Sequence, residues 1–333
     1  MQHNFFVYNT NMKLIEAVPN ISEGQNQASI RALADCLRAA PDVQLLGTDA
    51  NPAANRTVFT LIGKPEAVCH ALFDFISLAS TLIDMRTQRG AHPRLGAVDV
   101  CPLVPLREIS LQETAQLARY LGQRVGAELQ IPVYLYEAAA AGPTCQNLAD
   151  IRRGEYENLA EKLRALPPDF GPSDWNTHVK KTGACVIGAR NFLVAFNINL
   201  NTHDEQIAKQ IAARLRERDG GLKGVKAIGW YMENFHRAQV SCNIVDFRAA
   251  PLHLVFETCQ KEAAPLGVRA TGCELVGLVP LEAILAAGRH YAPAEKDPQI
   301  LIQAAIKGLN LCEVKPFIPT EQILEIKART MTM

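Results

Sequence analysis

Several common signals are missing from this 333-residue sequence, and each absence excludes a class of protein. The 34 basic residues balance the 34 acidic ones, so no charge surplus points to a nucleic acid or an anionic membrane. No apolar run approaches the ~20 residues of a membrane span. Residues 1–11 also lack the basic stretch and apolar run of a secretion signal. We therefore expect a small-molecule ligand, and neither nucleic acid nor membrane as a partner.

The nine cysteines are scattered and contain no C-x-x-C pair. An odd number without such spacing favours reduced thiols in the cytoplasm over a disulfide framework or a zinc site. The H-E-x-x-H motif, the Walker A phosphate loop and the dinucleotide-binding glycine pattern are absent too. We therefore expect no metal, no nucleoside triphosphate and no NAD.

The length and the 48% hydrophobic content suit two packed cores. In the first half, hydrophobic periodicity predicts strands at 13–18, 43–49, 57–62 and 98–104 and helices at 28–39 and 65–83. This is the split β-α-β order of ferredoxin-like folds. A helix that starts with a Ser110 and Glu113 capping box, a strand at 132–136 and a helix at 147–165 are expected to follow.

The second half repeats this order. Strands are predicted at 192–200, 225–231, 238–246 and 273–278, and helices after a Thr202 and Glu205 capping box and at 251–264. The predicted class is therefore α/β, with two ferredoxin-like halves. The expected divisions are an N-terminal extension (1–11), a first subdomain (12–182), a second subdomain (183–312) and a C-terminal tail (313–333).

The strands of the second half have one polar side. Asn197 and Asn199 alternate with apolar residues, and so do Gln239, Ser241 and Asn243. A solvent-exposed sheet face explains this pattern, and so does a ligand crevice between two polar faces. The sequence leaves both readings open.

His92 is the candidate for proton transfer. Pro93 restricts it to extended backbone angles, and Gly90 and Gly96 permit bends on either side, so the segment presents this side chain. Imidazole changes its charge near neutral pH without help from its surroundings. Taken alone, a histidine in a surface loop is the simpler explanation.

Ordered motifs along the chain resemble the formiminotransferase domain. They are Val18 to Gly24, Asp49-Ala50-Asn51, Asn55 to Val58, Leu82 to Met85, Gly90 to Pro102, Asp169 to Ser173, Gly188-Ala189-Arg190 and Ala195 to Asn199. In animals this domain is the N-terminal part of formimidoyltransferase-cyclodeaminase. The resemblance runs from about Met12 to near Cys312.

The resemblance implies two α/β halves packed sheet towards sheet, a folate tunnel between them, and a homodimer. It also implies a reaction in histidine degradation, in which the formimino group of N-formimino-L-glutamate passes to N5 of tetrahydrofolate, the co-substrate. L-glutamate is released. No cyclodeaminase part follows in this chain, so we expect a separate cyclodeaminase to act downstream.

The resemblance also assigns residues. His92 matches the family's catalytic histidine, and Asp49 matches an aspartate near the reacting group, although Asp49 alone would suit a turn residue. Three arginines inside matching motifs are expected to bind carboxylates of the donor or of folate: Arg56, Arg94 and Arg190.

The remaining expected contacts fall in three places. Asn20 and Glu23 lie in the opening motif, where Glu23 could instead cap the following helix, and Asn197 lies in a strand of the second half. The segment 171–183 matches the family's folate-contacting loop, from which we expect contacts by Gly171, Pro172, Ser173, Trp175, Thr182 and Gly183. Trp175 could stack on a flat ring or anchor the loop.

Two other functions compete with formimino transfer. Formyl transfer from N-formyl-L-glutamate to tetrahydrofolate would need the same pocket. A non-catalytic module that senses folate or an amino acid would suit the paired halves alone.

Overall fold

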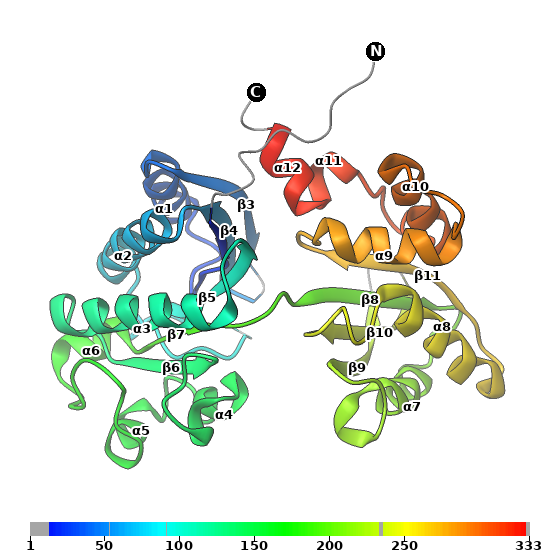
Figure 1. Cartoon of the computed structure of the whole chain (residues 1–333). Coiled ribbons are helices and arrows are strands. Elements are labelled where there is room, and N and C mark those ends of the chain that lie inside the picture. The colour runs from blue at the N-terminus through cyan, green and yellow to red at the C-terminus, as the bar shows by residue number, and fades with distance from the viewer. Residues whose placement is uncertain (1–12, 53, 91, 233–235, 331–333) are drawn as a thin grey trace. The chain divides into compact units, whose positions relative to one another are not determined.

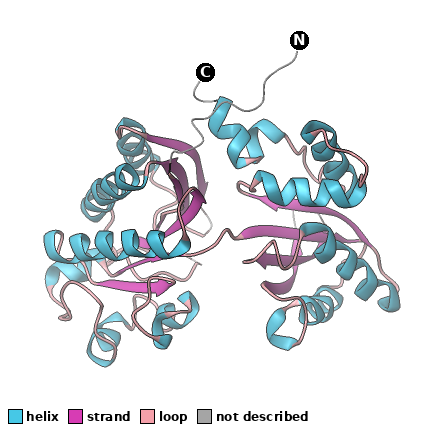
Figure 2. Ribbon diagram, in the orientation of Figure 1, coloured by secondary structure: helices cyan, strands magenta, loops and turns pink. Residues whose placement is uncertain are grey.

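The chain folds into two compact units, Met1–Arg190 and Asn191–Met333, here called the N-terminal and C-terminal units. The structure, a computed structural model, describes residues 13–52, 54–90, 92–232 and 236–330. Each unit combines helices with one sheet, so the predicted α/β class is confirmed (Figures 1 and 2). The expected ligand tunnel between the halves stays a prediction.

The N-terminal unit is built on a seven-stranded sheet. Its strands are β1 (Leu14–Ala17), β2 (Asn20–Ile21), β3 (Val43–Asn51), β4 (Arg56–Gly63), β5 (Val98–Arg107), β6 (Val133–Glu137) and β7 (Cys185–Ala189). Both β1 and β2 pair with β4 on one side and β5 on the other, all antiparallel. The strand predicted at 13–18 is therefore continued beyond Pro19, which has no N–H to donate to a neighbouring strand.

The order β3, β4, β1 with β2, then β5 is that of the predicted split β-α-β unit. β7 and β6 extend the sheet beyond β5 in parallel register. We expected the halves to divide after Thr182, but the compact units divide after Arg190. The reason is that β7 pairs with β5 and so belongs to the first sheet.

Six helices complete the described part of the N-terminal unit: α1 (Gln27–Ala39), α2 (Pro65–Leu82), α3 (Leu111–Glu128), α4 (Leu148–Arg152), α5 (Leu159–Ala165) and α6 (Thr177–Thr182). A short 3₁₀ turn, Pro143–Cys145, precedes α4. The predicted capping box of Ser110 and Glu113 is present at the start of α3. Asn26 caps α1, since its side chain accepts the N–H groups of Ala28 and Ser29.

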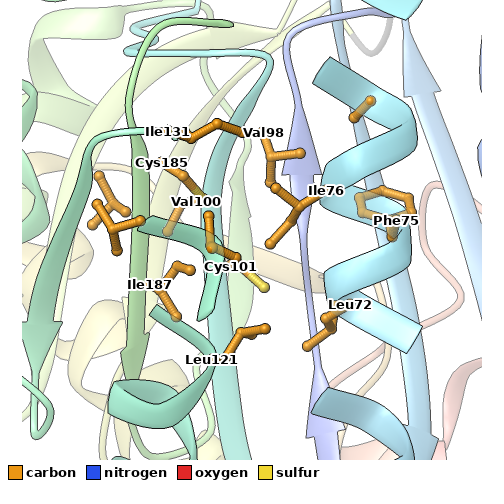
Figure 3. Packing of buried hydrophobic residues seen from close by; sticks show 14 of the residues in the cluster. Leu72, Phe75, Ile76, Val98, Val100, Cys101, Leu121, Ile131, Cys185 and Ile187 are labelled. Carbon is orange, nitrogen blue, oxygen red and sulfur yellow. The ribbon is translucent and has the colours of Figure 1, made fainter. Parts of the chain in front are cut away.

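The core of the N-terminal unit lies between its helices and the sheet. Figure 3 shows part of it, with Leu72, Phe75 and Ile76 on α2, Val98, Val100 and Cys101 on β5, Leu121 on α3 and Cys185 and Ile187 on β7. Phe75 meets Phe59 of β4 edge to face, with ring centroids 5.1 Å apart. The helices α1 and α2 therefore cover one face of the antiparallel strands.

The helix predicted at 147–165 is wrong in its middle. It is broken into α4 and α5 by a turn in which Gly154 has φ +83° and Glu155 has φ 54°. Such angles end a helix. The break matters for the site, because it brings Arg152 and Glu157 to the loop that carries His92.

The C-terminal unit has a four-stranded sheet in the order β11, β8, β10, β9. The strands are β8 (Val194–Leu200), β9 (Val225–Met232), β10 (Arg237–Ile244) and β11 (Ala270–Val276). All three pairings are antiparallel. This is again the predicted ferredoxin-like order.

The described helices of this unit are α7 (Glu205–Leu215), α8 (Leu252–Ala263), α9 (Leu281–Tyr291), α10 (Pro298–Gly308), α11 (Pro319–Gln322) and α12 (Leu324–Thr330), with 3₁₀ turns at Glu217–Asp219 and Ala264–Leu266. The predicted cap of α7 was wrong by two residues. Asp204 accepts the N–H of Gln206, and Thr202 instead accepts the N–H of Asp204. The expected tail 313–333 contains α11 and α12, and Ile323 is buried in the core of this unit.

All nine cysteines are unpaired, in agreement with the expected absence of a disulfide framework.

Among the residues that the structure describes, no helix combines the length and the apolar character that crossing a bilayer requires.

Candidate active site

Three segments of the N-terminal unit meet around His92: the turn after β2, the hairpin between β3 and β4, and the loop before β5. Asn55 joins all three, since its Oδ1 accepts the N–H of Gly24 at 2.8 Å and its Nδ2 donates to the Arg89 carbonyl at 2.6 Å. Ser22 Oγ donates to the Gly96 carbonyl at 2.8 Å. These links between distant parts of the chain hold the His92 loop in place.

The segment 171–183 is paired with the same loop. Gly96 and Gly183 form an isolated antiparallel bridge, and the Ala97 N–H donates to the Thr182 carbonyl at 2.8 Å. Gly183 has φ +67°, and a Cβ there would collide with the Leu95 carbonyl. Only glycine fits this crossing. Thr182 and Gly183, two expected folate contacts, thus lie directly beside the His92 loop.

The ring of His92 is held in one tautomer. Its Nδ1 lies 2.8 Å from the Pro93 carbonyl oxygen, which can only accept a hydrogen bond. Nδ1 therefore carries the proton in the neutral ring, and Nε2 carries a free lone pair. A histidine in this state is ready to take a proton through Nε2.

The surroundings of His92 favour the neutral ring. Partial burial lowers the pKa of His92 below its ordinary value, and the positive charge of Arg56 lowers it further. The hydrogen bond to Pro93 and the charge of Asp99 act in the opposite direction, while Arg152 adds to the lowering. The net direction is downward, so the imidazole is a base at neutral pH.

The charges beside His92 form one cluster around Asp99, here called the Asp99 cluster and consisting of Arg56, Asp99 and Arg152. Asp99 is fully buried, and its Oδ2 accepts from Arg56 Nη1 at 2.7 Å and from Arg152 Nη2. Its Oδ1 accepts the Leu95 N–H at 2.9 Å. One carboxylate thus holds two guanidinium groups and the loop that follows His92.

The arginines of the Asp99 cluster have more hydrogen-bond donors than Asp99 can accept. The Nε of Arg152 is buried and has no hydrogen-bond partner within the described residues. Leaving a buried donor unpaired costs about 1–3 kcal/mol. With two guanidinium groups facing one carboxylate, the cluster also keeps a surplus of positive charge.

Asn20 and Asp49 lie on the sheet face that carries Arg56. Asn20 and Asp49 are both partners of Val58 across neighbouring strands, and Arg56 is two residues before Val58. Arg56 Nε donates to Asn20 Oδ1 at 3.1 Å. Asp49 is exposed, and no hydrogen bond joins it to His92 among the described residues.

Glu23 makes a turn rather than a helix cap. Its Oε1 accepts the N–H groups of Gln25 and Asn26 at 2.8 and 2.9 Å, while the cap of α1 is Asn26 itself. This carboxylate thus stabilises the segment between β2 and α1.

Arg94, one of the expected carboxylate-binding residues, already holds two acidic side chains. It donates to Glu157 at 2.8 Å and to Glu155 at 3.4 Å, and Nη2 donates to the Gln88 carbonyl at 3.1 Å. A substrate carboxylate would have to compete with both glutamates. Arg94 therefore ties the His92 loop to the turn between α4 and α5.

The first residues of the segment 171–183 are placed by packing. Gly171 has φ +84° and lies against the Ile131 carbonyl, where no Cβ would fit. Pro172 is partly buried and Ser173 is exposed. Trp175 packs against the core, and its ring lies 5.5 Å from that of Tyr156. This contact accounts for Trp175 as an anchor, and stacking on a ligand stays a prediction.

Two expected contacts, Arg190 and Asn197, are described by their own surroundings. Arg190 follows β7, and its N–H donates to the Leu103 carbonyl, four residues beyond Asp99 along β5. At about 3.3 Å per residue along a strand, the backbone of Leu103, to which Arg190 is bound, is roughly 13 Å from that of Asp99. Asn197 lies in the C-terminal unit, where its Nδ2 donates to Glu274 at 3.4 Å.

The strongest interactions of the site involve two residues that the sequence did not single out. Asp99 stands in a motif used for the resemblance, yet a buried role was not assigned to it. Arg152 lies in no such motif and was read as part of a regular helix. A signal for Asp99 was its place at the start of an apolar strand, where a buried carboxylate needs a cationic partner.

Comparisons with known proteins define the class. Residues 14–190 match the model of the formiminotransferase domain, N-terminal subdomain, and residues 195–329 match that of the formiminotransferase domain. The chain therefore belongs to the formiminotransferase domain family, as the motifs indicated.

Free-standing relatives are covered almost completely. The chain is 42% identical to a glutamate formimidoyltransferase of Streptococcus pyogenes serotype M1, covering 85% of this chain and 94% of the relative. The corresponding enzyme of Thermoplasma acidophilum is 41% identical, with 84% and 92% covered. The formimidoyltransferase-cyclodeaminase of Rattus norvegicus is 46% identical over 94% of this chain, which spans 59% of that protein's length.

Proposed function

We propose that this protein transfers the formimino group of N-formimino-L-glutamate to N5 of tetrahydrofolate and releases L-glutamate. The family and the free-standing relatives, which are glutamate formimidoyltransferases, support a formimidoyl transferase acting on glutamate. The observation that carries the proposal is the state of His92, whose Nδ1 is bound to the Pro93 carbonyl, so that the lone pair of the neutral ring lies on Nε2.

The reaction needs a group that first accepts and then returns a proton. N5 attacks the formimino carbon, and the new C–N bond forms as N5 loses its proton to Nε2 of His92. The tetrahedral centre then collapses, the bond to the glutamate nitrogen breaks, and His92 returns the proton to the departing amine. Atoms and charge balance without any further reactant.

The charged groups around His92 suit this exchange. Burial and the charges of Arg56 and Arg152 lower the pKa of His92, so the neutral imidazole is ready to accept the proton. Asp49, exposed on the face shared with Arg56, is proposed to stabilise the amidinium form of the donor. Contacts to substrate or folate by Asn20, Glu23, Arg94, Arg190, Asn197 and the segment 171–183 remain proposals of the same kind.

The test is turnover by the purified protein with tetrahydrofolate and either of two donors. We expect L-glutamate release from N-formimino-L-glutamate to be much faster than from N-formyl-L-glutamate. His92→Gln should lower kcat by about 10²- to 10⁴-fold and leave tetrahydrofolate binding unchanged. A preference for the formyl donor would replace the reaction by formyl transfer. No turnover of either donor by the wild type, with ligand affinity unchanged in His92→Gln, would favour a sensing module.

Three further points belong to the proposal. We propose that the protein forms a homodimer, acts in the cytoplasm, where its nine free cysteines would stay reduced, and hands its product to a separate cyclodeaminase. Tetrahydrofolate is proposed as a co-substrate, and the expectation that no metal takes part stays a prediction.

A further inference from the structure

We propose that Arg56 and Arg152, held together by Asp99, bind the α-carboxylate of the amino-acid donor. The inference deepens the proposed function and rests on it for the identity of the donor. It adds Arg152, which lies at the end of α4 and outside every motif that points to the family.

The first argument is the supply of unused donors. In the Asp99 cluster, Arg56 donates to Asn20 through Nε and to Asp99 through Nη1, and Arg152 donates to Asp99 through Nη2. Within the described residues, Arg56 Nη2 and both Nε and Nη1 of Arg152 have no partner. Two guanidinium groups with unused N–H bonds around one carboxylate are suited to a second carboxylate, which would take one unused donor from each arginine.

The second argument is charge. Arg56 and Arg152 side chains are only 9% and 15% exposed, and Asp99 is fully buried, so water screens this cluster poorly. All three charged groups of the cluster, Arg56, Arg152 and Asp99, act on His92. Their sum is one positive charge, and an anionic ligand would neutralise it.

The third argument is the distance between each carboxylate of the amino-acid substrate and its reacting nitrogen. In N-formimino-L-glutamate the α-carboxylate is attached to the carbon that carries the reacting nitrogen, whereas the γ-carboxylate is two methylene groups further away. The Asp99 cluster is close enough to His92 to affect its ionisation. Asp99 also binds the Leu95 N–H, three residues after His92, which fixes the cluster relative to the ring. A carboxylate bound there would keep the formimino carbon close to the loop that carries His92.

The experiment compares ligands that differ only in one carboxylate. Binding is measured by calorimetry without tetrahydrofolate, so no turnover is needed, for N-formimino-L-glutamate and its α-carboxamide and γ-carboxamide analogues. We expect the α-carboxamide to bind the wild type roughly 10- to 100-fold more weakly than the parent compound. In Arg152→Gln this difference should shrink to a few-fold, because Arg56 alone is balanced by Asp99.

The matched control is Arg153→Gln. Arg153 is the next residue, its side chain is 80% exposed, and it pairs with Asp150 on the surface. We expect it to keep the full preference for the α-carboxylate. Arg152→Lys, which retains the charge without the planar fork, should fall between the wild type and Arg152→Gln.

The outcomes separate the two proposals. Loss of the α-carboxylate preference in Arg152→Gln, at unchanged melting temperature, supports the anion site even if the wild type turns over no formimino donor. In that case the reaction alone would be wrong. The inference is overturned if the wild type and Arg152→Gln prefer the α-carboxylate equally. It is also overturned if the γ-carboxamide, rather than the α-carboxamide, weakens binding to the wild type. Both results hold whether or not the reaction is observed.

Discussion

Gly96 and Gly183 face each other as a single antiparallel bridge, and a side chain fits at neither position. The bridge joins the loop of the proposed base to the segment expected to contact folate. The two segments are therefore held together at this point.

Gly183→Ala tests this crossing. With φ +67° and ψ −153°, Gly183 occupies a region almost exclusive to glycine, and the added Cβ would strike the Leu95 carbonyl. We expect a loss of about 2–4 kcal/mol in the free energy of unfolding, measured with urea. Gly142→Ala is the control, because nothing lies within 4 Å of its Cβ position. Equal stability of both variants would contradict the strained crossing.

The lowered pKa of His92 predicts a pH profile. A group with a lowered pKa stays unprotonated to more acidic pH, so kcat/KM should remain flat down to below the ordinary imidazole value of about 6.5 and then fall. NMR titration of the His92 ring should give the same midpoint. In Arg152→Gln the midpoint should move to higher pH, since one of the charges that lower it is gone. A shift to lower pH would show that Arg152 does not act on His92.

Asp99→Asn should destabilise the protein severely. The substitution keeps a carbonyl oxygen for the Leu95 N–H but leaves Arg56 and Arg152 side by side without a buried counter-charge. We expect a loss of about 3–5 kcal/mol in unfolding free energy. Asp150→Asn, which breaks a surface pair with Arg153, should cost less than about 1 kcal/mol. Comparable losses in the two variants would mean that the buried cluster contributes little.

Arg94→Met separates a structural role from substrate binding. Arg94 is buried, and its partners Glu155 and Glu157 are partly exposed, so the glutamates can be hydrated when the guanidinium is lost. We expect faster proteolysis of the turn between α4 and α5, with a KM for the donor changed less than about threefold. A large rise in KM at unchanged proteolysis would instead assign Arg94 to a substrate carboxylate.

The cysteines predict a thiol count. Cys312 is exposed and should react with an aromatic disulfide reagent within the dead time of mixing. Cys36 should follow more slowly, because partial burial and the nearby Asp74 raise its pKa. Burial raises the pKa of Cys185 and Cys259 well above the ordinary value, so they should react only on unfolding. Fewer than nine thiols in denaturant would contradict the unpaired state.

Local features of the sequence predicted much of the fold. The capping box of Ser110 and Glu113 marked the start of α3, and Pro65 marked that of α2. Both signals work because a helix start needs partners for its first N–H groups, which residues a few positions away can supply. The helix expected at 147–165 failed because Gly154 and Glu155 adopt left-handed angles, which apolar periodicity does not report.

Some features of the candidate site could likewise be predicted from the sequence, and others could not. The sequence by itself singled out His92, because Pro93, Gly90 and Gly96 mark a loop that presents its side chain. It also predicted the order of the four ferredoxin-like strands in each half through the alternation of helices and strands. Only the tertiary structure decided that Arg152 and Arg56 share Asp99, from 53 and 43 residues away, and that β7 belongs to the first sheet. Such pairings depend on which surfaces meet after the chain has folded, and no period or spacing within a segment encodes them.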